Sequence, residues 1–254
     1  MQGFVGLEHA NEFLEAALPG GVGGRTASER HATRETLVHA DLRTSLLGDL
    51  EVCVADAGYP IKPQRAIYEL RRALGPEDIV VSDVGAHKIW IARLYQAYEP
   101  NTVIISNGLA AMGISLPGAI AAKLVYPERR VVALCGDGGF LMNSQELETA
   151  VRLKLDLVIV IVEDSAYGMI RWKQAVDRFP DFGMTFGNPD FVAYAKSYGG
   201  HGHRIASAAE LVPTLEAAFA AGGVHLVAVP IDYSENTRVL VDELGGRVAN
   251  VDAR

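Results

Sequence analysis

The chain has few cysteines, few aromatic residues and no long apolar run. Its 254 residues include two cysteines, Cys53 and Cys135, which are too few for a disulfide framework. Because no run of about 18 or more apolar residues occurs, we expect no membrane-spanning helix. The amino terminus lacks a basic start followed by an apolar core, so no secretory signal is predicted. These absences favour a cytoplasmic protein that does not bind a membrane.

Basic residues are outnumbered by acidic ones. The chain has 23 Lys and Arg against 31 Asp and Glu, a formal net charge of −8. A nucleic-acid-binding face needs clustered Lys and Arg, so we expect no nucleic-acid partner. No G-x-G-x-x-G follows the first predicted strand, which argues against a nicotinamide dinucleotide. The chain is 49% hydrophobic and 21% charged, which indicates a soluble enzyme with one main domain.

The first 55 residues give weak structural signals. Residues 7–17 predict one helix, and a flexible glycine-rich stretch follows at 19–24. Residues 26–44 are mostly polar without a clear period. We therefore interpret residues 1–55 as a linker or poorly ordered segment, 56–235 as the main domain and 236–254 as a carboxyl-terminal tail.

From Pro63 onward, predicted strands and helices alternate. Predicted strands cover 78–82, 103–106, 131–135, 157–162 and 224–229. Predicted helices cover 63–74, 87–97, 110–125 with a break or kink at Pro117, 144–154, 167–174 and 188–198, and Ser207 with Glu210 starts another. This alternation predicts an α/β fold, a three-layer open parallel sheet with helices on both faces.

Two carboxylates stand where strongly apolar runs stop. Asp137 follows the run at 131–135 within Gly136-Asp137-Gly138-Gly139, and Asp164 follows the run at 157–162. In a parallel sheet both lie at the same carboxyl edge, where such sheets bind ligands. The glycines let a ligand approach the backbone, and Asn143 with Glu146 is interpreted as a capping pair of the next helix.

A pair of aspartates facing an anion needs a hard cation between them. The pattern therefore predicts a diphosphate held through Mg²⁺, whose preferred ligands are oxygens. Asp83 and Ser106 also end predicted strands and add polar groups to the same edge. The alternative for Asp137 is a plain tight turn with a capping aspartate. His201 and His203 stand close together beside glycines, and we interpret them as an incidental pair and not as a metal site.

The segment from Asp137 to Met169 resembles the thiamine-diphosphate motif of thiamine-dependent enzymes. Further motifs resemble the carboxyl-terminal cofactor domain of acetolactate synthases, and the resemblance runs from about residue 58 to about residue 233. The motifs are Val84-Gly85-Ala86-His87-Lys88-Ile89-Trp90, Ser106-Asn107-Gly108-Leu109-Ala110-Ala111-Met112, Gln145-Glu146-Leu147-Glu148-Thr149-Ala150 and Asn188-Pro189-Asp190-Phe191.

The resemblance implies thiamine diphosphate and Mg²⁺ as cofactors. It assigns the metal to the carboxylates of Asp137 and Asp164 and to the backbone carbonyl of Ala166. Family members more often carry Asn where Asp164 stands, so this chain has one more charge there. The remaining positions contact the diphosphate, prop the cofactor rings or wall the pocket: Gly85, Ala86, His87, Gly136, Gly138 and Gly139; Ala110 and Met112; Tyr167, Gly168, Met169 and Ile170.

Two of these positions also have a purely structural interpretation, and the resemblance assigns no role to Trp172. Without the resemblance, His87 is interpreted as a surface helix histidine and Met112 as core filler. Trp172 is one position out of register with the tryptophan of the biosynthetic branch.

The resemblance also implies a missing part. In this family a glutamate that activates the cofactor belongs to a separate pyrimidine-binding domain, and residues 1–55 are too few to hold it. The sequence therefore names no catalytic residue. It predicts a partner chain, or a longer gene product of which this chain is a fragment, together with a homo- or hetero-oligomer and negligible activity of the chain alone. The predicted substrates are pyruvate and a second 2-oxo acid. Another split thiamine-dependent decarboxylase and an inactive cofactor-binding fragment remain as alternatives.

Overall fold

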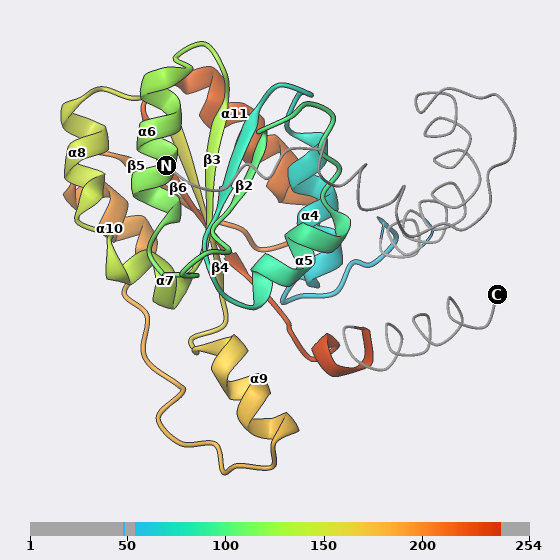
Figure 1. Cartoon of the computed structure of the whole chain (residues 1–254). Coiled ribbons are helices and arrows are strands. Elements are labelled where there is room, and N and C mark those ends of the chain that lie inside the picture. Colours follow the sequence, from blue (N-terminus) through green and yellow to red (C-terminus); the bar gives the residue numbers. More distant parts are fainter. Residues whose placement is uncertain (1–47, 49–53, 240–254) are drawn as a thin grey trace, which may run out of the picture. The chain divides into compact units, whose positions relative to one another are not determined.

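A computed structural model describes residue 48 and residues 54–239 of the chain (Figure 1). The predicted helix at 7–17 lies outside the described residues. Six parallel strands form one open sheet in the order β2-β1-β3-β4-β6-β5. They are β1 (Ile79–Ser82), β2 (Val103–Ile105), β3 (Val131–Gly136), β4 (Leu157–Glu163), β5 (His201–Arg204) and β6 (Val224–Pro230). The predicted fold class is confirmed.

Helices cover both faces of the sheet (Figure 1). One face packs against α4 (Pro63–Arg72), α5 (Ala86–Leu94) and α11 (Leu211–Ala221), which follows the short 3₁₀ helix η2 (Ala208–Glu210). The other face packs against α6 (Ser115–Val125), α7 (Asp137–Met142), α8 (Glu146–Arg152) and α10 (Phe191–Ser197). Helix α9 (Gly168–Val176) belongs to neither layer. It extends beyond the carboxyl edge of the sheet, and none of its residues is fully buried.

Alternate residues of the central strands enter opposite faces. In β4, Val158 and Val160 belong to the first core, whereas Ile159 and Ile161 belong to the second. Because successive strand side chains point to opposite faces, a strand covered on both sides is apolar throughout. Cys135 of β3 is fully buried in the second core, as expected for a small hydrophobic residue, and burial raises the pKa of its thiol well above the usual range.

The predicted helix at 110–125 is too long at its amino end. Helix α6 begins at Ser115, and a turn precedes it in which Ala110 and Gly113 have φ angles of 49° and 90°. The carboxylate of Asp83 accepts the Gly113 and Ser115 N–H groups and fixes this turn. Pro117 therefore stands in the first turn of α6, where its missing N–H needs no partner, and it does not interrupt the helix.

The predicted cap of the helix at 144–154 is wrong. Helix α7 starts directly at Asp137, and α8 starts at Glu146 with no side-chain cap. The Asn143 amide nitrogen instead donates to the Gly113 carbonyl at 2.8 Å, while Glu146 accepts from the Thr149 hydroxyl.

The next two predicted helix starts are also changed. Helix α10 begins three residues later than predicted, because Asp190 accepts the Val192 and Ala193 N–H groups. The Ser207 hydroxyl donates to Glu210 at 3.2 Å but caps no helix N–H.

The described start of the predicted tail lies against α5. Trp90 donates its indole N–H to Asn236 at 2.8 Å, and Val239 is buried in the first core. Among the described helices, none is both long and apolar enough to span a bilayer.

Candidate functional site

The strand order has a topological switch point between β1 and β3, and the candidate ligand site there is called the crevice below. The crossover after β1 runs to β2 on one side, and the crossover after β3 runs to β4 on the other, so the two crossovers diverge. Ligands of open parallel sheets bind at such a switch point, outside the carboxyl ends of the strands. Asp83 and His87 follow β1, Gly136 ends β3 and Asp137 begins α7. The site residues predicted after these two strands therefore belong to the same crevice.

Asp137 ties the ends of β3 and β4 together. Its side chain is 1% exposed, and its Oδ1 accepts the Gly138 N–H at 2.8 Å. Its Oδ2 accepts the Ser165 N–H at 2.7 Å and the Asp164 N–H at 3.2 Å. The two predicted aspartates thus lie at the same edge, joined by direct hydrogen bonds. The alternative of a plain turn accounts for the Gly138 bond alone.

Asn188 completes this arrangement, and its role was missed in the sequence. Its amide nitrogen donates to Asp137 Oδ2 at 2.8 Å, while its buried Oδ1 has no partner among the described residues. In the sequence, Asn188 marked a helix start and belonged to one of the motifs that carry the resemblance, but no site role was assigned to it. A hydrogen bond across 51 positions leaves no local signal in the sequence.

The Asp164 carboxylate is held at a raised pKa. Partial burial and the charge of Asp137 raise the pKa of Asp164 from 3.8 to about 6, although the Ala166 N–H and Arg171 act in the opposite direction. Two carboxylates that repel each other in this way are stabilised by a cation placed between them. This electrostatic state fits a divalent ion bound by Asp137 and Asp164.

A backbone oxygen lies close to the two carboxylates. Ala166 pairs with Thr185 in an antiparallel bridge, but the hydrogen bonds run from Tyr167 N and to Ser165 O. The Ala166 N–H and C=O therefore point to the other side, where its N–H faces Asp164. No group of three or more metal-binding side chains occurs in the described part of the chain. An ion here needs carbonyl or ligand oxygens, which Mg²⁺ accepts readily.

The predicted glycines are also required by the protein's own side chains. A Cβ on Gly138 would lie 2.8 Å from the Tyr167 ring, and one on Gly168 would lie 2.8 Å from Asp164 Oδ2. A Cβ on Gly139 would lie 3.0 Å from Asp83 Oδ1. Gly139 lets α7 pack closely against Asp83, and Gly168 lets α9 pack closely against Asp164. These glycines therefore have a structural reason beside the predicted contact with a ligand.

His87 is buried, contrary to its interpretation as a surface residue. Its side chain is 4% exposed and lies against Gly85 and Gly136, and its Nε2 has no partner among the described residues. Burial lowers the pKa of His87 from 6.5 to about 4, with Asp83 opposing the shift. A buried ring nitrogen without a partner among the described residues is a binding group that the local structure does not use.

Asp83 positions the turn that carries Ala110 and Met112. Its fully buried carboxylate accepts the Gly113 N–H at 2.9 Å and the Ser115 hydroxyl at 2.9 Å. Met112 is only partly buried, so it does not act as core filler. The fourth strand-end residue, Ser106, receives the Lys88 ammonium on its carbonyl at 3.2 Å. Asp83 thus shapes one wall of the crevice, a role that its position in the sequence did not reveal.

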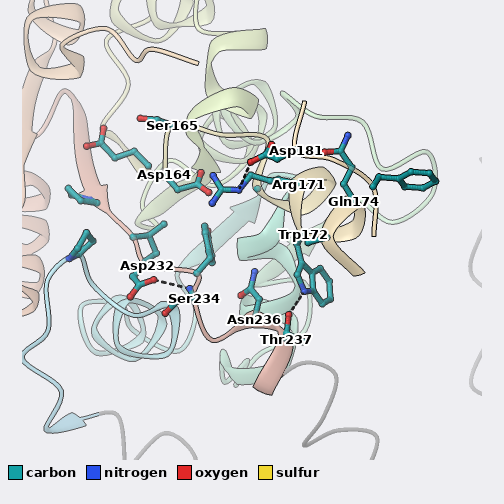
Figure 2. A pocket seen from close by; sticks show the side chains of 18 of the residues that line it. Asp164, Ser165, Arg171, Trp172, Gln174, Asp181, Asp232, Ser234, Asn236 and Thr237 are labelled. Carbon is teal, nitrogen blue, oxygen red and sulfur yellow. Dashed lines mark hydrogen bonds and ion pairs between the residues drawn. The ribbon is translucent and has the colours of Figure 1, made fainter. Parts of the chain in front are cut away.

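A cavity of about 760 Å³ opens beside Asp164 (Figure 2). Helix α9 and the segment after β6 form its walls, and Trp172 donates its indole N–H to Thr237 at 2.9 Å between them. Arg204 and Glu163 form an ion pair at its base. Of the four residues predicted to wall the cofactor pocket, only Gly168 lines this cavity. Burial and the two aspartates raise the pKa of Tyr233, another lining residue, well above its usual range.

Known proteins match this chain through the same region. The family model "Thiamine pyrophosphate enzyme, C-terminal TPP binding domain" matches residues 83–229. An acetolactate synthase of Bacillus subtilis (strain 168) is 38% identical over 213 residues, which are 84% of this chain and 37% of that protein. A catabolic acetolactate synthase of Raoultella terrigena is 43% identical over 179 residues, 68% of this chain and 32% of that protein.

The acetolactate synthase isozyme 2 large subunit of Escherichia coli (strain K12) is 38% identical over 170 residues, 65% of this chain. The chain spans about a third of the length of these curated relatives. The matched region contains every strand of the sheet except β1 and the last residue of β6, and it includes both aspartates. The chain therefore belongs to the thiamine pyrophosphate enzymes and carries their C-terminal TPP-binding domain.

Proposed function

We propose that this chain is the thiamine-diphosphate- and Mg²⁺-binding half of an acetolactate-synthase-like enzyme. Such an enzyme decarboxylates pyruvate and joins the product to a second 2-oxo acid. The observation that carries the proposal is the hydrogen-bonded link between the ends of β3 and β4, which holds Asp137 beside Asp164. The reaction class is supported by the two relatives that are acetolactate synthases.

In this proposal Asp137, Asp164 and the Ala166 carbonyl hold the metal. The backbone of Gly136, Gly138 and Gly139 would face the diphosphate, together with Gly85, Ala86 and His87, although the Gly138 N–H also donates to Asp137. A diphosphate against the free Nε2 would favour the protonated imidazole and raise the pKa of His87 from about 4. Bound thiamine diphosphate would supply the electron sink that decarboxylation requires.

The remaining predicted contacts orient the cofactor rings. The turn fixed by Asp83 would present the Ala110 carbonyl and the Met112 side chain to them. The start of α9 carries the other predicted wall residues, which are Tyr167, Gly168, Met169 and Ile170. The Tyr167 ring packs against Phe186 with centroids 4.9 Å apart, which limits its movement. These residues would keep water from the reacting atoms.

The proposed enzyme needs a second domain. A pyrimidine-binding domain on another chain would supply the glutamate that activates the cofactor, in a homo- or hetero-oligomer. Helix α9 offers a surface for such a domain, because Ile170, Val176, Phe179 and Phe182 are exposed on it and on the loop that follows. Exposed apolar residues gathered on one projection are typical of an interface.

Isothermal titration calorimetry of the full chain tests the binding proposal. Thiamine diphosphate should bind in the presence of Mg²⁺ and lose at least about tenfold in affinity with EDTA. Asp164→Ala should abolish the Mg²⁺ dependence, whereas Asp164→Asn, which keeps an oxygen ligand, should retain it. Asp177→Asn, on the exposed end of α9, is the matched control. Binding that is equal in Asp164→Ala and in the wild type would refute the metal site.

A chimaera tests the reaction. Residues 56–235 should replace the matching part of the Bacillus subtilis relative and restore acetolactate formation from pyruvate, while the isolated chain stays inactive. The same chimaera with Asp137→Ala should be inactive. Decarboxylation without condensation would favour the alternative of another split 2-oxo acid decarboxylase. A folded chimaera that binds the cofactor but turns over no oxo acid would favour an inactive cofactor-binding fragment.

A further inference from the structure

A second cavity, of about 260 Å³, lies at the opposite edge of the sheet. It is formed where β3, β4 and β6 begin, between the carboxyl end of α6 and α11. This edge faces away from α7 and α9 (Figure 1). Strand β3 is six residues long, so the two edges are about 20 Å apart and the cavity is separate from the proposed cofactor site.

The wall of this cavity contains a buried ammonium group that has no carboxylate partner in the described part of the chain. Lys123 is 8% exposed, and its Nζ donates to the carbonyls of Pro127 at 2.7 Å and Arg129 at 2.8 Å. An ammonium group has three donors, so one remains for the cavity that it lines. A buried positive charge of this kind is strongly stabilised by an anion.

Two arginines line the same cavity with their guanidinium groups over aromatic rings. The Arg129 guanidinium carbon lies 4.7 Å from the centre of the Tyr126 ring, and that of Arg130 lies 4.9 Å from the centre of the Phe219 ring. A cation–π contact leaves the guanidinium N–H groups available as donors, although Arg130 donates one to the Ala73 carbonyl. Guanidinium donors suit the oxygens of a phosphate group.

One acidic residue of the wall adds selectivity. Asp156 Oδ1 accepts the Gly223 N–H at 2.6 Å, which fixes the carboxylate and leaves Oδ2 as an acceptor. Glu128 is exposed at the rim. An anion that carries its own O–H can donate to Asp156, whereas a fully deprotonated one is repelled by it. Hydrogen phosphate has this proton at neutral pH, and sulfate does not.

We propose that this cavity is a binding site for inorganic phosphate. Lys123, Arg129 and Arg130 accept the negative charge, and Asp156 accepts the proton of hydrogen phosphate. The size of the cavity fits a small ion better than a cofactor, because pockets for larger ligands start at about 300 Å³. The proposal is independent of the cofactor site and of the reaction at the other edge.

The test is an NMR titration of the full chain with inorganic phosphate and separately with sulfate, both at constant ionic strength. Phosphate should saturate shifts of the Leu157, Phe219 and Gly223 amides and bind at least about tenfold more tightly than sulfate. The double variant R129Q/R130Q should lose at least about tenfold in affinity, and Asp156→Asn should bring sulfate to the affinity of phosphate. Arg152→Gln, an exposed arginine on α8, should bind phosphate as the wild type does.

Two results would overturn the proposal. They are phosphate shifts that do not saturate, and equal phosphate affinity in R129Q/R130Q and the wild type. Equal binding of sulfate by the wild type would overturn the assignment of the ion. The amide spectrum of each variant reports its folding, so a misfolded protein is recognised in the same experiment.

Discussion

Replacing Asp164 with asparagine should stabilise the chain in the absence of metal. The pKa of Asp164 lies at about 6 in the folded chain and near 3.8 when the residue is free of its surroundings. The folded state therefore holds the proton more tightly than the unfolded state, and stability is lost as the pH rises from about 4 to about 6. Asparagine has the same shape and no charge, so Asp164→Asn avoids this loss.

The size of the effect follows from the raised pKa. A difference of about two pH units between the folded and unfolded pKa corresponds to about 3 kcal/mol. Because Asp164 is only partly buried, solvent screening reduces the expected gain to about 1–2 kcal/mol. The gain should be full at pH 7.5 and close to zero at pH 4.

Urea unfolding in EDTA, followed by circular dichroism, measures this difference at both pH values. Asp177→Asn is the control, because Asp177 pairs with Lys173 at the exposed end of α9. Saturating Mg²⁺ should stabilise the wild type more than Asp164→Asn, so the difference between their free energies of unfolding should become smaller. Two results would refute the raised pKa of Asp164. One is that Asp164→Asn is no more stable than the wild type at pH 7.5, and the other is that its gain in the free energy of unfolding is as large at pH 4 as at pH 7.5.

Two further substitutions test the turn beside the crevice and the packing of α10 on β5. Asp83→Asn should lower the free energy of unfolding by about 3 kcal/mol, since the new amide faces the N–H groups of Gly113 and Ser115; urea unfolding measures the loss. Wild-type stability in this variant would show that Asp83 does not hold the turn. Gly202→Ala should cost about 1–3 kcal/mol or more in the same assay, because its Cβ would lie 2.5 Å from the Val192 backbone, whereas Gly108→Ala, with no atom within 4 Å, should be neutral. Equal stability of these two alanine variants would contradict the close packing of α10 on β5.

The fold could be predicted because its main signal is local. Buried parallel strands must be apolar on both faces, so the runs at 131–135 and 157–162 marked β3 and β4 directly. Parallel strands then bring their carboxyl ends to one edge, which placed Asp137 near Asp164 without any structure. Strand β5 was not among the predicted strands, because it lies at the edge of the sheet and its residues, His-Gly-His-Arg, are polar.

Two of the errors lie where a distant group decides the local structure. The turn at 110–114 has good helix formers, but Asp83, about 30 positions earlier, takes the N–H groups that a helix would use. Asn143 is a suitable cap by type, yet its amide donates to the Gly113 carbonyl instead. A local pattern cannot contain these partners, because hydrogen-bonding side chains choose among competing backbone groups in the folded chain.

The same long-range bonds explain why two aspartates at one edge have different tasks. Asp137 accepts N–H groups from the ends of β3 and β4 and from Asn188, so its charge is largely used to join three segments. Asp164 has fewer donors and a raised pKa, so its carboxylate is the one left short of positive charge. A cation at this edge would therefore gain most from Asp164, while Asp137 fixes where that cation can lie. Removing Asp137 should disturb the site itself, and removing Asp164 should mainly weaken the metal.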